Sequence, residues 1–231
     1  MRQGAVKKEV FALLAGEERE AVMERLRALP RPAVLKALFS GICRHEELLR
    51  WRAISALGAM VAELAAEEME AARIVVRRFM WSLNDESGGI GWGVPEAMAE
   101  CLALHPGLAE EYAHILVAFM REEGFFLEYP PLQQGLMWGI GRLAEARPAL
   151  LQEKRAPAWL PAYLDSPDPV VRGLAARALG YLQATESQAA IAALSKSSFP
   201  IRLYHDWQIT PVSEGQLARE ALARLNSHEN P

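Results

Sequence analysis

The chain is poor in cysteine, in long hydrophobic runs and in net positive charge, and each absence excludes a class of protein. Two cysteines among 231 residues, Cys43 and Cys101, cannot build a disulfide framework. No apolar run approaches the roughly 20 residues that span a bilayer. Residues 1–9 lack the apolar core of a signal peptide. We therefore expect a cytoplasmic protein.

The charge balance argues against bulk binding of nucleic acids. The formal net charge is −4, whereas proteins that grip a phosphate backbone usually carry a basic face. The chain has no Gly-x-Ser-x-Gly, Cys-x-x-Cys or kinase motif, and its histidines lack metal-ligand spacing. The sequence therefore predicts no catalytic residues, no cofactor and no metal site.

A short helical motif, Ala-Leu-Gly-x-Leu at residues 178–182, recurs along the chain. Its small residue returns at intervals of 39 to 43 residues, at Gly58, Ala99, Gly141, Gly180 and Ala223. A repeat of this length with two helical stretches per unit predicts a stacked α-solenoid.

Proline positions and apolar periodicity predict the helices and leave no alternating strand pattern. The expected helices span residues 4–15, 18–29, 32–44, 47–65, 67–82, 95–104, 107–122, 131–146, 157–164, 168–183, 186–196 and 214–226. From residue 32 they pair as an A helix followed by a B helix, and the motif lies on each B helix. We therefore expect an all-α fold, an α-α superhelix (HEAT/ARM-like solenoid) of about five helical pairs. It would form one domain over 1–231, with an N-terminal helical cap (1–31), repeats (32–226) and a tail (227–231).

The segment 168–180 resembles the HEAT-repeat family, in particular its PBS-lyase-type HEAT-like repeat. It has the aspartate-proline entry at Asp168-Pro169, the valine-arginine pair at Val171-Arg172 and an alanine-rich helix. Arg50 keeps the arginine in an earlier copy, whereas Gln133 replaces it in another. The resemblance implies the fold, and it implies a scaffold that binds other macromolecules, since this family hosts few enzymes.

Aligning the copies separates the core columns of the B helices from a stripe that points away from the A helices. In HEAT-type solenoids the B helices line the concave side, and aromatic side chains on a polar surface are typical of a binding groove. The alternative is that these tryptophans fill gaps left by the small residues. The expected groove residues are Trp51, Trp92, Glu96, Glu100, Trp138, Arg142, Arg177 and Tyr181.

Three connections that enter B helices are much longer than a turn, namely residues 82–94, 123–130 and 197–212. Long insertions on one edge of a repeat protein often form its binding face. The glycines of 88–93 would suit an anion at a helix N-terminus, a hard cation bound by neighbouring oxygens, or a structural loop. His205-Asp206 is a candidate acid/base pair or a simple hydrogen-bonded pair. The candidate binding residues in these connections are Asn84, Asp85, Glu86, Tyr129, His205, Asp206 and Trp207.

The leading hypothesis is a non-enzymatic HEAT-repeat scaffold that binds a protein or peptide through the B-helix groove and the long connections. One alternative is a DNA-binding protein, or an enzyme, similar to the alkylpurine DNA glycosylases, which are HEAT-like solenoids of about this size. Another is a lyase or lyase chaperone, because similar repeats occur in phycobilin lyases. We expect a protein partner rather than nucleic acid or membrane, and a monomer or weak dimer.

Overall fold

The computed structural model describes residues 3–16, 18–84 and 91–227, and the contacts within it divide the chain into two compact units. Unit 1 comprises residues 1–105 together with Tyr204–Ile209, and unit 2 comprises Pro106–Leu203 and residues 210–231. The single repeat domain expected over the whole chain stays a prediction.

Unit 1 is built from six helices among its described residues. They are α1 (Gln3–Leu14), α2 (Arg19–Arg27), α3 (Arg31–Gly41), α4 (Glu47–Glu67), α5 (Met69–Leu83) and α6 (Val94–Leu104). Helix α4 packs against α3, α5 and α6, and α1 packs on α3. The interior is apolar, with Leu38, Ile54 and Phe79 fully buried.

Unit 2 contains the remaining helices of the described chain, several of them short. They are α7 (Pro106–Ala118), α8 (Pro130–Ala146), α9 (Pro148–Glu153), η1 (Ala156–Ala158), η2 (Leu160–Asp165), α10 (Pro169–Tyr181), η3 (Thr185–Ser187), α11 (Gln188–Leu194) and α12 (Glu214–Asn226). Helix α10 packs between α8 and α12, so three B helices of the repeat lie side by side.

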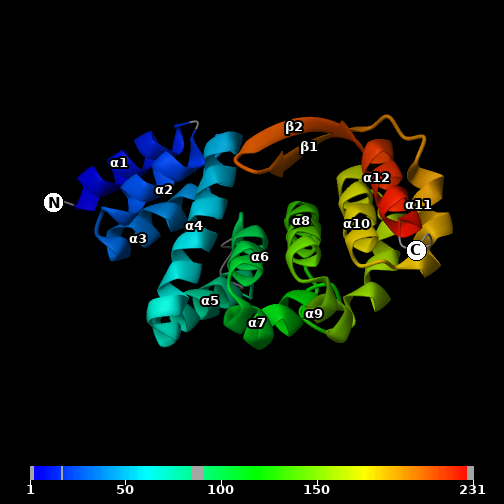
Figure 1. Cartoon of the computed structure of the whole chain (residues 1–231), viewed down its shortest axis with the longest axis horizontal. Coiled ribbons are helices and arrows are strands. Elements are labelled where there is room, and N and C mark those ends of the chain that lie inside the picture. Colours follow the sequence, from blue (N-terminus) through cyan, green and yellow to red (C-terminus); the bar gives the residue numbers. More distant parts are fainter. Residues whose placement is uncertain (1–2, 17, 85–90, 228–231) are drawn as a thin grey trace. The chain divides into compact units, whose positions relative to one another are not determined.

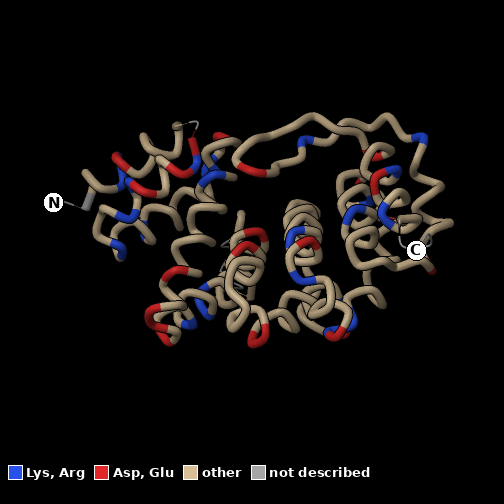
Figure 2. The backbone as a smooth tube through the Cα atoms, in the orientation of Figure 1, with Lys and Arg blue, Asp and Glu red and all other residues tan. Residues whose placement is uncertain are grey.

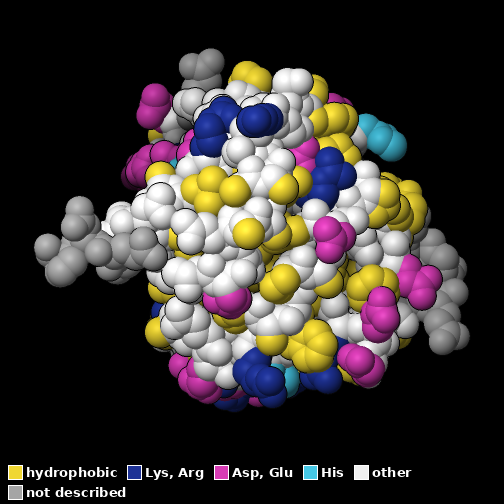
Figure 3. Space-filling model, turned by 90° about the vertical axis from the view of Figure 1, so that its right-hand side faces the viewer, with side chains coloured by type: hydrophobic (Ala, Val, Ile, Leu, Met, Phe, Trp, Pro, Cys, Tyr) yellow, Lys and Arg dark blue, Asp and Glu magenta, His cyan; other side chains and the backbone are white. Residues whose placement is uncertain are grey.

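The end of unit 2 that carries α11 and α12 shows small hydrophobic patches between charges of both signs (Figure 3). Surfaces of this mixed kind are ordinary in globular proteins, because apolar atoms contribute more than half of the accessible surface. This end therefore gives no sign of a large apolar interface.

The small-residue column lets neighbouring B helices approach closely, as the repeat predicts. A Cβ added at Gly180 would lie 2.7 Å from the Cα of Ala221 on α12, and one at Gly58 would lie 2.5 Å from Cγ of Glu100 on α6. A glycine inside a helix costs about 1 kcal/mol relative to alanine. At these two positions the close helix contact explains why glycine is present.

The arginine of the Val171-Arg172 pair ties its repeat to the next one. Arg172 donates from Nη1 to the carbonyl of Ser166 (2.8 Å), and from Nε and Nη2 to the carboxylate of Glu214 (2.6 and 3.2 Å). Glu214 is buried at the start of α12, where the helix dipole also favours its negative charge. The motif arginine therefore joins α10, its preceding turn and α12.

The expected connection at 197–212 contains a β-hairpin, which corrects the expectation that no strand is present. Strand β1 (Pro200–His205) pairs with β2 (Gln208–Ser213). Asp206 and Trp207 form the two-residue turn, with φ of 44° and 68°, as a type I′ hairpin turn requires. This turn lacks the glycine that usually marks it, so the local pattern does not predict a hairpin.

The expected helix 157–164 is instead two short 3-10 helices, η1 and η2. Proline has no N–H to donate, and Pro157 and Pro161 lie within this segment, so regular α-helical bonding cannot run through it. Helix α7 also ends at Ala118 rather than near residue 122. The amides of Met120 and Arg121 donate to carbonyls three residues earlier instead of continuing the α-helical pattern.

Candidate binding surfaces

The B-helix face of unit 1 is covered by the tip of the hairpin, residues 204–209. The ring of Tyr204 stacks on Trp51 with centroids 5.0 Å apart and planes 7° from parallel. Its hydroxyl donates to Oγ of Ser55 at 3.0 Å. Trp51 is only 8% exposed and Tyr204 only 2%, so the Trp51 indole packs against the protein's own hairpin.

Trp207 anchors the tip, with help from a buried arginine. Its Nε1 donates to the carbonyl of Gly16 at 3.1 Å. Arg52 donates from Nε to the carbonyl of Trp207 (3.2 Å), and its Nη1 reaches the carbonyls of Leu14 and Gly16 (3.1 and 2.8 Å). The Arg52 guanidinium also lies 5.4 Å from the centroid of the Trp207 ring, within range of a cation–π contact. Trp207 is thus buried in unit 1.

The other two candidates in the tip lie on its exposed side. Asp206 pairs with Arg19 through Oδ1 and Nη1 at 3.4 Å, with the Asp206 side chain 73% exposed. An exposed ion pair of this kind contributes little to stability. His205 is exposed as well, and the ion-pair partner of Asp206 is Arg19.

Glu96 and Glu100 lie one helical turn apart on α6, and both are buried. Burial raises the pKa of Glu96 to about 7, while the nearby charge of Arg50 opposes this rise. Oε2 of Glu96 has no hydrogen-bond partner. Both side chains are therefore part of the interior of unit 1 rather than of an open groove.

Glu96→Gln is expected to stabilise the protein at alkaline pH. The folded pKa near 7 exceeds the ordinary 4.5, so the folded state favours the proton, and stability falls as pH rises from about 4.5 to 7. The shift corresponds to at most about 3 kcal/mol. Urea unfolding should show the variant more stable than the parent at pH 8 and nearly equal at pH 5. Glu24→Gln, at an exposed site on α2, is the control, and an equal effect of both variants would contradict the burial of a charge at Glu96.

The connection between α5 and α6 is described only at its ends. Asn84 is exposed and caps α5, while Asp85 and Glu86 lie outside the described residues. Gly93 has φ of 70°, and a Cβ there would lie 2.7 Å from the carbonyl oxygen of Ile42. Trp92 is half-buried, and its carbonyl accepts a weak bond from Cys43 Sγ at 3.9 Å. The described end of this connection therefore packs closely on the residues after α3.

In unit 2 a network of charged and aromatic side chains joins the B helices α8, α10 and α12. The Tyr181 ring lies between two guanidinium groups, with the Cζ of Arg177 at 5.0 Å and of Arg224 at 4.3 Å from its centroid. Both arginines donate to its hydroxyl at 3.4 Å, and the hydroxyl donates to Oε1 of Glu145 at 2.8 Å. Burial raises the pKa of Tyr181, which keeps the donor protonated. We call this set (Glu145, Arg177, Tyr181, Arg224) the tyrosine clamp.

The residues around the tyrosine clamp continue the same polar face. Gln216 donates to Glu220 at 3.0 Å on α12, and Gln134 on α8 donates to Asp168 at 2.6 Å. Arg142 is half-buried on α8. Charged residues of both signs occur along α8 and α12 (Figure 2), so the face is mixed rather than basic.

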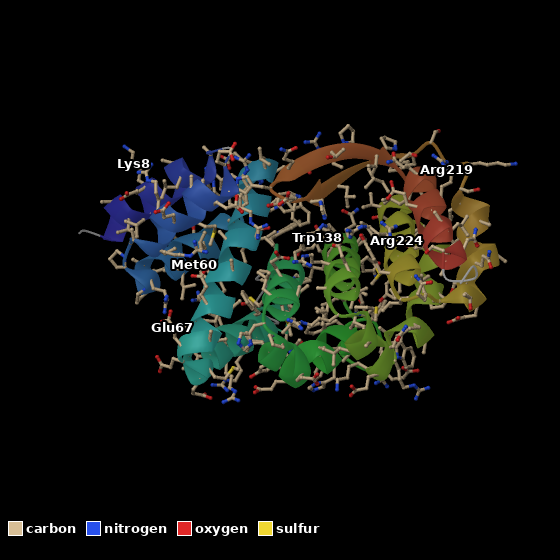
Figure 4. All side chains as sticks on the ribbon, viewed as in Figure 1. Lys8, Met60, Glu67, Trp138, Arg219 and Arg224 are labelled. Carbon is tan, nitrogen blue, oxygen red and sulfur yellow. The ribbon has the colours of Figure 1, made fainter. Side chains whose placement is uncertain are left out.

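Trp138 and Arg224, two side chains of this face, differ in how far they are buried. Trp138 on α8 is 5% exposed, so most of its indole is packed and little is left for a partner. Arg224 on α12 is half-buried, and its buried Nη1 has no hydrogen-bond acceptor among the described residues. Figure 4 labels both side chains. The Arg224 guanidinium therefore has one donor group that the described part of the chain does not satisfy.

Sequence reasoning placed Arg177, Tyr181, Trp138 and Arg142 on this stripe, and it missed Glu145 as a candidate. Glu145 lies one turn beyond the aligned columns, which is why the alignment of the copies did not include it. Arg52 was also missed, although it directly precedes the mainly apolar stretch 53–62 of α4, which was the available signal.

The connection before α8 borders a pocket of about 420 Å³ within unit 2. Aromatic groups form part of its wall, and Tyr163 is fixed by a hydrogen bond to the carbonyl of Met120 at 3.1 Å. Tyr129 is exposed at the N-cap of α8. Its wall includes the polar and aromatic side chains of Glu122, Glu123, Phe126, Gln133, Trp159 and Tyr163.

The comparisons with known proteins support the repeat fold. No family model matches the chain. An uncharacterized protein of Archaeoglobus fulgidus is 32% identical over 108 residues, which is 47% of this chain and 52% of that protein. The chain thus spans about half the length of this relative.

Designed armadillo repeat proteins are similar in structure along nearly the whole chain. One, designed for modular peptide recognition, has a TM-score of 0.56 at 15% identity, covering 96% of this chain and 93% of its own. Another, in complex with the peptide (KR)4, has a TM-score of 0.54 at 15% identity, covering 94% and 98%. The chain therefore has an armadillo-like helical-repeat fold, and the PBS-lyase-type resemblance stays a prediction. No helix among the described residues is long and apolar enough to cross a membrane.

Proposed function

We propose that this helical-repeat scaffold binds a protein segment at the face formed by α8, α10 and α12, without catalysing a reaction. The observation that carries the proposal is the tyrosine clamp with its unsatisfied donor. A buried N–H without an acceptor costs about 1 to 3 kcal/mol. A bound segment that reorients this half-buried side chain would supply an acceptor for Nη1, such as a backbone carbonyl or a carboxylate.

The hairpin tip supports the choice of unit 2. In unit 1 the corresponding columns of α4 already contact Tyr204 through Trp51 and Ser55. In unit 2 the same columns carry Gln216, Glu220 and Arg142, each half-buried. The polar side chains on the B-helix face of unit 2 are therefore accessible enough to contact a bound partner.

The pocket beside α8 suits a cationic side chain of the same segment. Glu122 and Glu123 bring negative charge to a wall that includes Trp159 and Phe126. Aromatic faces with carboxylates attract ammonium and guanidinium groups. The guanidinium of Arg121 already lies 4.8 Å from the Trp159 ring centroid, so an incoming cation would depend on the carboxylates of Glu122 and Glu123 and on Phe126. Designed armadillo neighbours bind peptides, and one carries a basic peptide, which supports a peptide as the ligand class.

Variants of the tyrosine clamp test this proposal. Peptides would be selected from a random twelve-residue display library on the full chain, and their affinity would be measured by fluorescence polarisation. We expect Arg224→Gln to weaken the selected peptides by about tenfold or more, because a charge-assisted hydrogen bond contributes about 1.5 to 3 kcal/mol. Tyr181→Phe, which removes the hydroxyl that both arginines contact, should weaken them as well.

Lys196→Gln provides the matched control, since Lys196 is an exposed cation of unit 2 away from the clamp. The proposal fails if Lys196→Gln and Arg224→Gln have the same effect, or if no peptide is selected. Circular dichroism of each variant checks that its helices are retained. Trp138 is a poor choice for this test, because removing a 5% exposed indole would also leave a cavity.

The nucleic-acid alternative is tested by a gel shift with alkylated duplex DNA at low salt. The face of α8, α10 and α12 combines its arginines with Glu145 and Glu220, an arrangement that does not favour a phosphate backbone. We expect no binding at micromolar protein, and saturable binding there would support the alternative instead.

A further inference from the structure

Unit 1 contains a pocket of about 620 Å³, and none of the expected groove residues is among the described residues that line it. Its lining comes from α1, α3 and the two residues after it, α5, and Gly91 and Val94 near the start of α6. The polar or charged groups in the lining are Lys7, Lys36, Ser40, Cys43, Arg78 and Ser82. No aspartate or glutamate is among the described residues that line it, and the charged side chains in that lining are all cationic.

Three cationic side chains from three different helices line this pocket. Lys7 belongs to α1, Lys36 to α3 and Arg78 to α5. Like charges that converge in this way repel one another, and an anion between them relieves the repulsion. Their convergence through the tertiary fold, rather than along one helix, is what a site for a negatively charged ligand requires.

Several other arginines of unit 1 have carboxylate partners, whereas no ion pair is found for these three cations among the described residues. Arg27 pairs with Glu63 and Arg31 with Glu67, both at 2.6 Å. Arg77 pairs with Glu70 although it is adjacent to Arg78 in the sequence. The cations of the pocket therefore remain available to a ligand.

The aromatic ring of Phe39 orients one of the cations. The Cζ of Arg78 lies 4.1 Å from the ring centroid, a close cation–π contact. A guanidinium held flat on a ring loses less freedom when its edge donates to an anion, and a planar fork of N–H groups fits a phosphate well. The Arg78 guanidinium is thus held in an orientation that suits a phosphate, and Lys7 and Lys36 line the same pocket.

The rest of the lining is apolar and small. Ala33, Ala37, Ile42 and Val94 contribute to the wall. A ligand that contacts both the cationic side chains and the apolar wall must combine an anionic group with an apolar group. We propose that this pocket binds a small organic phosphate monoester, with Lys7, Lys36 and Arg78 contacting the phosphate and the alanines facing the organic group.

Calorimetric titration of the full chain with phenyl phosphate tests the proposal. We expect a dissociation constant below about 1 mM at low salt, weakening as salt is added. Inorganic phosphate and phenol, which each carry half of the ligand chemistry, should bind at least tenfold more weakly. If inorganic phosphate binds as tightly, the apolar part of the proposal is wrong, and if phenol binds as tightly, the anionic part is wrong.

Variants that each remove one positive charge test whether phenyl phosphate binds in this pocket. Lys36→Gln and Arg78→Gln should each weaken phenyl phosphate about tenfold, because each loses a charge-assisted hydrogen bond. Lys8→Gln is the control, since Lys8 is an exposed lysine of α1 beside Lys7 that does not line the pocket. Equal effects of Lys8→Gln and Lys36→Gln, or no measurable binding at 10 mM ligand, would overturn the site.

Cys43 gives a second readout that does not depend on any variant. Its thiol lines the pocket and is accessible, whereas Cys101 is buried. Partial burial raises the pKa of Cys43, so alkylation by iodoacetamide is best followed near about pH 9, where thiolate forms. Saturating phenyl phosphate should slow the alkylation of Cys43 severalfold, and an unchanged rate would contradict binding in this pocket.

Discussion

Replacing Glu214 with alanine should lower the free energy of unfolding of unit 2 by about 3 to 5 kcal/mol. The carboxylate is 1% exposed and pairs with Arg172, and it also accepts a hydrogen bond from Ser197. Its removal leaves the guanidinium of Arg172, which is mostly buried, without its counter-charge. Urea unfolding followed by circular dichroism measures the loss.

Two further variants show whether the loss comes from the ion pair. Glu220→Gln, at a half-buried carboxylate on the same helix, should change the free energy by less than about 1 kcal/mol. Arg172→Met combined with Glu214→Leu should recover much of the loss, because an apolar pair can replace a buried ion pair. If Glu214→Ala costs no more than Glu220→Gln, the motif arginine does not join the repeats as described.

Trp207→Ala should cost unit 1 about 3 to 5 kcal/mol, as is typical for removing a large buried aromatic side chain. The indole is 3% exposed, donates to Gly16, and lies beside the guanidinium of Arg52. Without it the tip loses its anchor, and the left-handed backbone of the turn at Asp206 and Trp207 loses the contacts that hold it. Chemical unfolding gives the size of the loss, and hydrogen exchange should show faster exchange in residues 204–209.

Gln208→Ala is the matched control for this variant. Gln208 follows Trp207 in the hairpin and is exposed, so its truncation should change the free energy by no more than about 0.5 kcal/mol. Unchanged exchange of the tip in Trp207→Ala would show that Trp207 does not fasten the hairpin to unit 1.

Most helices could be predicted because their signals are local. Apolar spacing, prolines at helix starts and caps such as Asp168, which accepts from the amide of Val170 at 2.8 Å, are all visible in the sequence. The hairpin could not be predicted, because its turn uses Asp206-Trp207 and its strands contact residues more than 140 positions away, such as Ser55. Tertiary contacts, rather than β-propensity, decide this segment.

The candidate surfaces were predictable only where the repeat itself carries the information. Aligned columns brought Arg177 and Tyr181 to one face, and the structure adds Arg224 to the same cluster. The columns could not show that Tyr204 covers Trp51, because that contact comes from outside the repeat. Nor could they show the pocket of Lys7, Lys36 and Arg78, since its three cations come from helices with no common motif.

Hydrogen–deuterium exchange of the full chain, with and without a peptide selected on it, tests the central claim most directly. Binding at the face of α8, α10 and α12 predicts slower exchange at the exposed ends of these helices and in residues 119–129, with no change in residues 204–209. Slower exchange confined to α4 and the hairpin tip, with α8, α10 and α12 unchanged, would contradict the account.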